Sequence, residues 1–380
     1  MNNVLSPDLK TAAPAATGSL LPGIGRRIAL VLGLTLLSVL LIGGLLNGVL
    51  SGESLRRLRS ADLGSVRWTM LAAALAVHLA GLGFEAVQLK LLSAAIGKPA
   101  RFRQMLRVYL VGNVVAQITP SALGGEPAQL YVMSRDGYAL AESSFLLTLR
   151  AFFSVAARVV LIIGFGLAAV PSRSWPKSPA WNILAAVTAA AMILFFVALF
   201  LFFFTARIRS WVTRMAGKFP LLVRLFRCRT EDEFREKCGR FALQFRALMI
   251  TVFRDKRKAL AGGFLIALFS WISAKSVPFF IMKAFGESPS WPVVVAAGII
   301  AQIAAGWAPT PGAVGAAEAA MAAFFFPLVV RGDPAVLIPL FVLLFRFFEF
   351  PLNVLITIPL VPRLFRGKTK TAPVSEGVSA

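Results

Sequence analysis

The chain carries one short pattern twice, as Thr119-Pro120-Ser121-Ala122-Leu123-Gly124-Gly125-Glu126 and as Thr310-Pro311-Gly312-Ala313-Val314-Gly315-Ala316-Ala317-Glu318. Each copy places helix-breaking proline and glycine and one acidic residue inside apolar sequence, and an arginine follows in the next apolar run (Arg150 and Arg346). A bilayer penalises broken backbone and buried charge unless protein surrounds them. The repetition therefore predicts two related halves around one polar site, which is the plan of many transporters.

The composition excludes an ordinary soluble protein, because 58% of the residues are apolar and the mean hydropathy is +0.77. A run of about twenty apolar residues spans a bilayer. Six runs reach that length: 28–50, 68–92, 145–170, 181–204, 260–284 and 335–361. Two shorter, interrupted regions, 104–134 and 293–330, contain the repeated pattern. The sequence thus predicts an all-α polytopic membrane protein with six full transmembrane helices and two re-entrant helical hairpins.

The order of these segments indicates an inverted repeat within a single transmembrane domain at 28–365. Each unit is a span, a broken hairpin and a span, with repeat one at about 68–170 and repeat two at about 260–361. We expect the flanking segments 1–27 and 366–380 to be disordered and cytoplasmic.

Basic residues are concentrated between the two units. The formal charge is +23, and residues 205–258 hold fifteen Lys/Arg against five Asp/Glu. A nucleic-acid-binding segment is a weak interpretation between two membrane spans, whereas the positive-inside rule accounts for the loop directly. The rule places 205–258, 97–107 and both termini in the cytoplasm, so the two hairpins enter from opposite sides. Loop 51–67, with four arginines, fits this topology poorly because it falls outside.

Within the basic segment, residues 230–253 are predicted to form an amphipathic helix. Thr230 and Glu233 fit a capping box, and an apolar stripe follows at spacings of four and three: Phe234, Cys238, Phe241, Phe245, Leu248 and Val252. The helix is either a connector packed under the bundle or a surface for lipid or a partner protein.

The repeated pattern supplies the candidate site. Proline stops each first half-helix, glycine permits the reversal, and the second half-helix turns its unpaired N–H groups toward the membrane interior, where an anion such as phosphate would be attracted. Glu126 and Glu318 either cap these helices or bind a cationic group of the cargo. Arg150 and Arg346 either form structural ion pairs or bind a lipid phosphate. The predicted substrate-binding residues are Arg150, Arg346, Glu126, Glu318, Gly124, Gly125, Thr119, Pro120, Thr310, Pro311, Gly312 and Gly315.

Charges inside spans need partners, and the sequence suggests several pairings. Arg150 could pair with Glu126, and Arg346 with Glu349 or Glu318. Glu85 and Lys275 occupy equivalent spans of the two units and could pair with each other. The remaining polar residues inside the spans are His78, Asn113 and Gln302.

Catalytic and metal-binding patterns are not apparent. The only cysteines, Cys228 and Cys238, lie in the basic loop without nearby histidine, which is a poor metal site. A Gly-rich phosphate loop and a nucleophile with a plausible histidine are both missing. We therefore expect no cofactor, no metal and no enzymatic activity.

The two motifs, Gly124 to Tyr131 with Arg150 and Pro309 to Glu318, resemble the lysylphosphatidylglycerol synthase transmembrane (flippase) family over about residues 27–365. The resemblance implies a lipid flippase fold of a bacterial-type inner membrane with two re-entrant hairpins. Fused members move an aminoacylated phospholipid between leaflets. The chain is expected to be a stand-alone member, because no soluble aminoacyltransferase domain follows Val361.

The sequence thus predicts a flippase for a phospholipid or another polar-headed lipid, with an anionic or zwitterionic headgroup, in a bacterial-type inner membrane. Two alternatives stay open. One is a non-catalytic partner of a lipid or glycolipid biosynthesis pathway, and the other is an integral membrane lipid transferase. A lipid-synthesis enzyme as partner and a homo-oligomer are compatible with the sequence, and no nucleic-acid partner is expected.

Overall fold

The computed structural model describes residues 66–169, 231–306 and 308–360, together with isolated helical positions between 183 and 197. The predicted span 28–50, the terminal segments, loop 51–65 and nearly all of the span 181–204 lie outside the described residues. Within the described part, the regular elements are helices, and four helical stretches are long and apolar enough to cross a membrane: Trp68–Ala95, Leu140–Ala168, Arg257–Ala284 and Pro334–Leu360. The predicted all-α polytopic architecture is confirmed.

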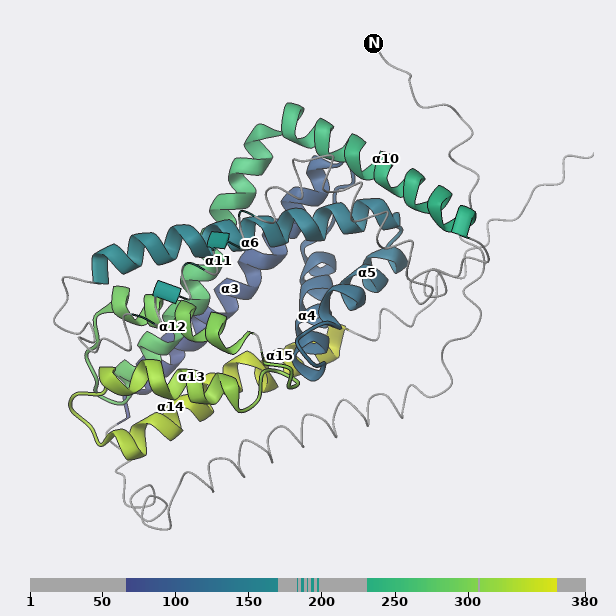
Figure 1. The fold of residues 1–380 in the computed structure, drawn as a ribbon. Coiled ribbons are helices and arrows are strands. Elements are labelled where there is room, and N and C mark those ends of the chain that lie inside the picture. Colours follow the sequence, from purple (N-terminus) through teal and green to yellow (C-terminus); the bar gives the residue numbers. More distant parts are fainter. Residues whose placement is uncertain are drawn as a thin grey trace, which may run out of the picture.

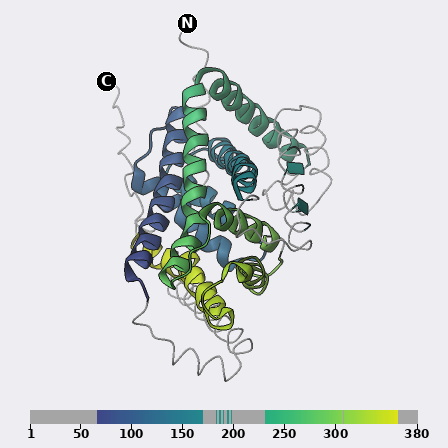
Figure 2. The ribbon, with the colours of Figure 1, turned by 90° about the vertical axis from the view of Figure 1, so that its left-hand side faces the viewer.

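Two long antiparallel helices form the centre of the molecule (Figures 1 and 2). They are α3 (Trp68–Ala95) and α11 (Arg257–Ala284). At one end the Arg67 N–H donates to the Ala284 carbonyl over 2.9 Å, and toward the other end Gln88 donates to the Gly263 carbonyl over 2.9 Å. A helix of this length extends about 42 Å at 1.5 Å per residue, so either one exceeds the hydrocarbon core of a bilayer.

The first hairpin consists of α4 (Phe102–Ile118) and α5 (Gly125–Arg135). Thr119 closes its tip, because its hydroxyl donates to the Val115 carbonyl over 2.9 Å and accepts the Gly124 N–H over 3.0 Å. The two helices pack closely at Gly125, where an added Cβ would lie 2.8 Å from the Ala116 Cβ. Glycine at 125 is therefore required by the packing.

The second hairpin consists of α12 (Trp291–Ala305) and α13 (Ala316–Phe325), which continues into a 3-10 turn at Phe326–Leu328. Its tip is closed differently. The Thr310 hydroxyl donates to the Val314 carbonyl over 2.9 Å, and the Gly315 N–H donates to the Glu318 carboxylate over 2.6 Å. Glu318 thus caps its own helix, as one of the two sequence interpretations proposed.

The two units begin in register and have the same order of elements. Helices α3 and α11 are both 28 residues long and start at Trp68 and Arg257, 189 positions apart, and the hairpins start at Phe102 and Trp291 with the same offset. Both tips also use two consecutive left-handed residues: Ser121 and Ala122 (φ 50° and 58°), and Gly312 and Ala313 (φ 59° and 53°). The repeat inferred from the sequence motif is present in the backbone.

The hairpin tips meet each other. Pro120 and Pro311 form an isolated antiparallel β-bridge, and a Cβ at Gly312 would lie only 2.8 Å from the Gln117 carbonyl oxygen. Each hairpin starts just after the end of α3 or α11, and those two helices are antiparallel. The hairpins therefore approach from opposite ends of the central pair (Figure 1).

The last span differs from the single clean crossing predicted at 335–361. It is divided into α14 (Pro334–Glu349), α15 (Pro351–Thr357) and a 3-10 turn at Ile358–Leu360. The break falls at Phe350 (φ −123°, ψ −67°), because Pro351 lacks an N–H and disfavours helical backbone at the residue before it.

The predicted amphipathic helix is present as α10 (Glu231–Asp255) and packs against α6 (Leu140–Ala169). The rings of Phe145 and Phe245 are 5.5 Å apart at centroids, and Val252 is 1% exposed. In the apolar stripe, Phe245 and Leu248 are thus half-buried and Val252 is buried, whereas the side chains of Phe234 and Cys238 lie outside the described set. The contact supports the connector interpretation of this helix.

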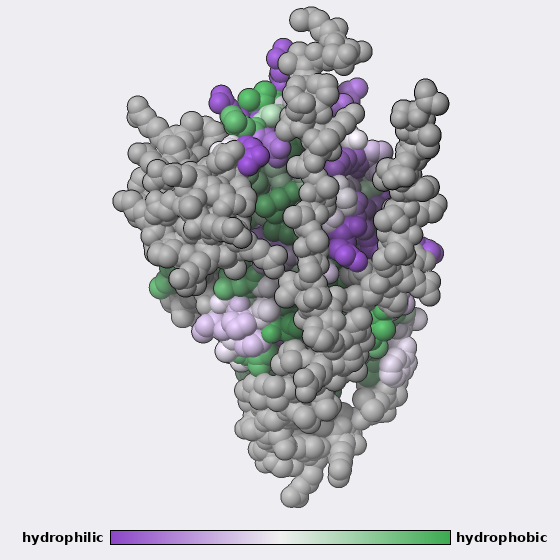
Figure 3. Space-filling view, turned by 90° about the vertical axis from the view of Figure 1, so that its right-hand side faces the viewer, coloured by the Kyte–Doolittle hydropathy of each residue, from purple (hydrophilic) through white to green (hydrophobic). Residues whose placement is uncertain are grey.

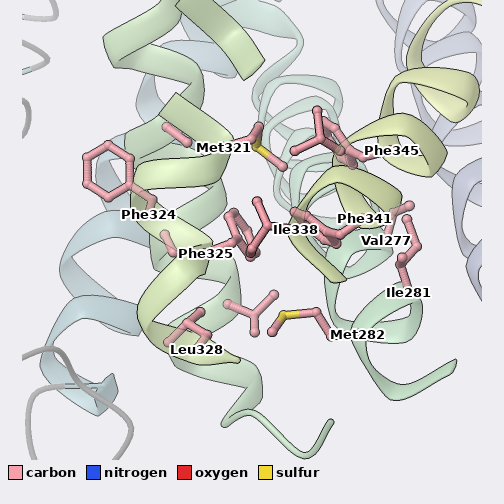
Figure 4. Packing of buried hydrophobic residues seen from close by; sticks show 14 of the residues in the cluster. Val277, Ile281, Met282, Met321, Phe324, Phe325, Leu328, Ile338, Phe341 and Phe345 are labelled. Atoms are coloured by element: carbon pink, nitrogen blue, oxygen red, sulfur yellow. The ribbon is translucent and has the colours of Figure 1, made fainter. Parts of the chain in front are cut away.

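An extensive apolar cluster in the second unit joins α11, α12, α13 and α14 (Figure 4). The rings of Phe325 and Phe341 lie 4.7 Å apart at centroids with a tilt of 33°, and Phe324, Phe325 and Ile281 are at most 1% exposed. This packing fixes the second hairpin against the last span.

Basic segments gather at one end of the central pair. The loop after α3 (Lys98, Arg101) and the start of α11 (Lys256–Lys258) lie there because the helices are antiparallel, and α10 leads into that end. In Figure 3 the strongly hydrophilic residues of the visible face lie in its upper half, toward α10. The positive-inside rule predicts that residues 97–107 and 205–258 lie on the same side of the membrane. The arrangement of the described residues agrees with that prediction.

The tight hairpin contact predicts a stability loss on Gly125→Ala. The new methyl group would overlap the Ala116 Cβ and approach the Gly112 carbonyl oxygen at 3.0 Å. Overpacking of this kind costs about 1–3 kcal/mol. Thermal unfolding in detergent should show a lower Tm for G125A. Gly83→Ala is the matched control, because no atom lies within 4 Å of its Cβ. Equal Tm values for the two variants would contradict the hairpin packing.

Candidate functional site

Two adjoining cavities lie between the hairpins and the central helices. One has a volume of about 200 Å³ and the other about 180 Å³. They share five lining residues: Gln117, Lys275, Gln302, Phe345 and Glu349. The first cavity is otherwise lined mainly by α3, α4, α6 and α11, with Phe348 of α14 and Asn353 of α15, and the second by the two hairpin tips, α12, α13 and Arg346 of α14. Polar and charged side chains thus surround a space inside an apolar bundle.

Arg150 of α6 borders the first cavity and is held by Glu85 of α3. The guanidinium Nη2 and Nε lie 2.7 and 2.8 Å from Glu85 Oε2, while Ser270 donates to Glu85 Oε1 over 2.8 Å. The Tyr109 ring centroid lies 4.9 Å from the Arg150 guanidinium carbon. The pairings suggested for Arg150 with Glu126 and for Glu85 with Lys275 are therefore wrong. The rotation of α3 turns Glu85 toward α6 rather than toward Lys275.

Arg346 of α14 is 6% exposed and borders the second cavity. Its Nε donates to Glu318 over 2.6 Å, its Nη1 to Glu349 over 3.3 Å and its Nη2 to the Gly312 carbonyl over 3.1 Å. Both suggested pairings, with Glu318 and with Glu349, are confirmed. Arg346 thereby joins the last span to the tip and to the second half-helix of the second hairpin.

Asn353 of α15 connects three helices across the cavity. Its side-chain oxygen shares a hydrogen bond of 3.0 Å with His78 of α3, and its amide donates to Asn113 of α4 over 3.1 Å. The same amide donates to the Glu349 carbonyl over 2.7 Å. The break before Pro351 places α15 where Asn353 can make these contacts.

The predicted site residues fall into two groups. Arg150, Arg346 and Gly312 border the cavities. The others build the tips, and among these Glu126 is exposed and forms no ion pair within the described part of the chain. Their role in binding a substrate stays a prediction. The tip residues outside the cavity lining are Thr119, Pro120, Gly124, Gly125, Glu126, Thr310, Pro311, Gly315 and Glu318.

Several polar or aromatic residues of the cavity wall were not singled out from the sequence, among them Gln117, Trp271 and Asn353. A usable signal existed for Trp271. It stands four positions before Lys275, so the two side chains share one face of α11. Asn353 had a weaker signal, as a polar residue just after a proline inside an apolar run.

The wall chemistry suits a polar group rather than a metal ion. Among the described residues, no three His, Cys, Asp or Glu side chains come together as ligands. The cavity wall instead presents amide, ammonium, guanidinium and carboxylate groups at the middle of apolar helices. Such groups can bind a charged or hydrogen-bonding headgroup.

Comparison with known proteins gives one family match and two relatives. The family described as the lysylphosphatidylglycerol synthase TM region matches residues 28–356. A UPF0104 membrane protein of Archaeoglobus fulgidus is 25% identical over 279 residues, which cover 72% of this chain and 81% of the relative. A UPF0104 membrane protein of Methanothermobacter thermautotrophicus is 27% identical over 306 residues, covering 78% and 84% respectively.

The Arg150–Glu85 contact predicts a strong energetic coupling. Removing one partner leaves a buried charge alone and costs about 3–5 kcal/mol, whereas replacing both by apolar residues is often neutral. Arg150→Met and Glu85→Met should each lower the Tm in detergent, and the double variant should recover most of the loss.

Lys98→Met and Glu142→Met provide the control, since this pair is more exposed, with side chains 39% and 21% accessible. A pair of that kind contributes at most about 1 kcal/mol. Additive losses in the E85M/R150M cycle would show that the two groups do not form the coupled pair seen in the structure.

Proposed function

The chain belongs to the family of the lysylphosphatidylglycerol synthase TM region, and from that premise we propose that it moves a phospholipid or another polar-headed lipid between the leaflets of a membrane. The observation that carries this proposal is the charged cavity enclosed by two oppositely directed hairpins whose tips meet at Pro120 and Pro311. Transporters place their substrate sites between inverted repeats with broken helices in this way.

In the proposed path the headgroup enters the cavity while the acyl chains stay in the bilayer. The polar side chains of the cavity wall would replace the hydrogen bonds to water that a headgroup loses. This replacement lowers the free-energy cost of moving a charge through the hydrocarbon core. Arg150 and Arg346 are proposed to act on the headgroup phosphate, and Glu126 and Glu318 on a cationic group. Each arginine already contacts a carboxylate, so a phosphate would bind the guanidinium group alongside that carboxylate.

We propose a bacterial-type inner membrane, with the two hairpins re-entering from opposite faces. The basic end formed by the loop after α3, the start of α11 and α10 would face the cytoplasm by the positive-inside rule. Both termini are placed on that same side. The proposed transport involves no covalent chemistry.

Reconstitution into liposomes tests the proposal directly. Fluorescent lipids in the outer leaflet are quenched by an impermeant reductant, so protein-dependent leaflet exchange appears as an additional quenched fraction. Anionic, zwitterionic and neutral headgroups should be compared at equal protein density. Exchange of at least one headgroup class above protein-free liposomes is expected, and no exchange for any class would overturn the proposal.

The partner alternative has one favourable feature, the exposed face of α10. Arg246 and Arg254 are exposed there, and so are Leu243 and Ile250, which share the face at spacings of three and four residues. Reversing both arginines to glutamate leaves the buried stripe intact, so a lipid transporter should retain exchange. A protein that acts only by recruiting a lipid-synthesis enzyme would instead show no exchange in liposomes and would lose its partner in this variant.

Transport through the cavity predicts that linking the tips stops it. Bridge partners in an antiparallel pair have Cα atoms about 4.5–5.5 Å apart, within the range for a disulfide. Pro120→Cys with Pro311→Cys, in a chain with Cys228 and Cys238 replaced by serine, should therefore cross-link under oxidation. Leaflet exchange should fall at least tenfold on oxidation and return on reduction.

Each single cysteine variant controls for the substitutions themselves and should be unaffected by oxidant. Full exchange in the fully cross-linked protein would contradict a path that requires the hairpin tips to separate.

A further inference from the structure

The charges around the two cavities do not all have contact partners. Three cationic side chains line the cavities, Arg150, Lys275 and Arg346, and a fourth, Arg158, lines neither cavity but lies against the Trp271 ring in the wall of the first. Three carboxylates accompany them, and each is in contact with an arginine: Glu85 with Arg150, and Glu318 and Glu349 with Arg346. Within the described residues, Lys275 and Arg158 contact no carboxylate.

Lys275 is 4% exposed and lines both cavities. Its aliphatic stem passes Gly298 of α12, where an added Cβ would lie 3.4 Å from the Lys275 Cδ. Its ammonium lies 5.5 Å from the centroid of the Trp271 ring. Glycine at 298 therefore gives the lysine room to extend, and the ammonium reaches the shared wall of the cavities.

Two cationic side chains lie near the ring of Trp271. The Arg158 guanidinium carbon lies 4.8 Å from the same ring centroid, and the Arg158 Nε has only a long 3.4 Å hydrogen bond to the Ser154 carbonyl. The indole N–H is fixed by the Ser154 hydroxyl over 2.9 Å. The ring thus holds an ammonium and a guanidinium near each other, although like charges repel and a ring face offers each only about 0.5–2 kcal/mol.

A buried ammonium in this setting needs an anion. Removing a charge from water costs several kcal/mol even after the protein relaxes, and a cation–π contact does not offset that cost. Both cavities greatly exceed the roughly 10–15 Å³ that one water molecule requires, so space for a small anion adjoins the ammonium. Structural ion pairing, which accounts for Arg150 and Arg346, does not account for Lys275.

Comparison of α11 with α3, its counterpart in the first unit, shows that Lys275 is not required for packing. With the 189-position offset between α3 and α11, Lys275 corresponds to Ala86 and Trp271 to Leu82, both of which are buried and apolar. The equivalent place in the first unit therefore packs without any charge. The fold does not require a lysine here, which favours a role in binding.

We propose that Lys275, with Trp271 and Arg158 beside it, binds a phosphate-type anion at the wall shared by the two cavities. The source of the anion, a phospholipid headgroup, rests on the proposed transport function, whereas the binding itself does not. The ammonium supplies a point charge, and Gln302 of α12, which lines both cavities, lies within the same wall.

The test uses purified, delipidated protein in detergent, and measures binding by titration and Tm. The probes are short-chain phosphatidylglycerol, short-chain diacylglycerol and inorganic phosphate. We expect phosphatidylglycerol to bind and to raise the Tm, with diacylglycerol at least tenfold weaker. Lys275→Met should weaken phosphatidylglycerol binding at least tenfold, and Lys275→Arg should restore part of it.

Lys283→Met is the matched control. Lys283 lies two turns further along α11 with its ammonium 5.1 Å from the Phe279 ring centroid, and it lines neither cavity. K283M should bind phosphatidylglycerol within twofold of wild type. Without probe, K275M should have a Tm at or above that of wild type, because an unpaired buried charge has been removed.

Three results would overturn the assignment: unchanged phosphatidylglycerol affinity in K275M, equal loss in K283M, or equal affinity for diacylglycerol. If inorganic phosphate bound with the same affinity as phosphatidylglycerol, the anion would not have to come from a lipid, and the site would be one for free phosphate. Lysine-dependent binding without leaflet exchange in liposomes would refute the proposed transport alone. Normal exchange with Lys275-independent binding would refute only the inference about Lys275.

Discussion

The contact between the two hairpin tips is the constraint on which the rest of the structure depends. A broken helix leaves unpaired N–H and carbonyl groups, which are costly away from water. Here Thr119 and Glu318 satisfy groups at their own tips, and Arg346 takes up the Gly312 carbonyl. With the Pro120–Pro311 bridge, these bonds hold the irregular backbone of the two tips together, and that backbone forms part of the wall of the second cavity.

The scaffold is repeated but its charges are not. The 189-position offset aligns α3 with α11 and the start of α4 with the start of α12. The same offset places Glu85 opposite Ala274 and Lys275 opposite Ala86. The repeated backbone therefore gives two similar hairpins, whereas the charged side chains differ between the two units. Under the proposed function, these unequal charges would provide one headgroup position rather than two.

Much of this fold could be predicted from local sequence. Proline and glycine inside apolar runs located both hairpin tips, and the spacing of Arg346 and Glu349 indicated an ion pair one turn apart. The Arg150–Glu85 pair could not be predicted from local spacing, because the two residues lie 65 positions apart in the sequence. Their contact depends on how α3 is rotated relative to α6. The division of the last span at Phe350 shows the same limit. Pro351 was visible in the sequence, but its consequence depends on Asn353 finding His78 and Asn113 across the bundle.

The distribution of ion pairs also bears on how firmly a headgroup can be held. A transport site must release its cargo and so cannot bind it too strongly. Under the proposed function the wall would meet this condition, because Arg150 and Arg346 are already paired with carboxylates. Arg150 and Arg346 keep the cavity polar and preorganised while their carboxylates limit their pull on a phosphate. Lys275 is different, because the carboxylate that shares its wall, Glu349, is in contact with Arg346. Lys275 and Arg158 are the two cations of this region that contact no carboxylate within the described residues, and beside two arginines that are already paired they can bind an anion without the additional attraction of Arg150 and Arg346.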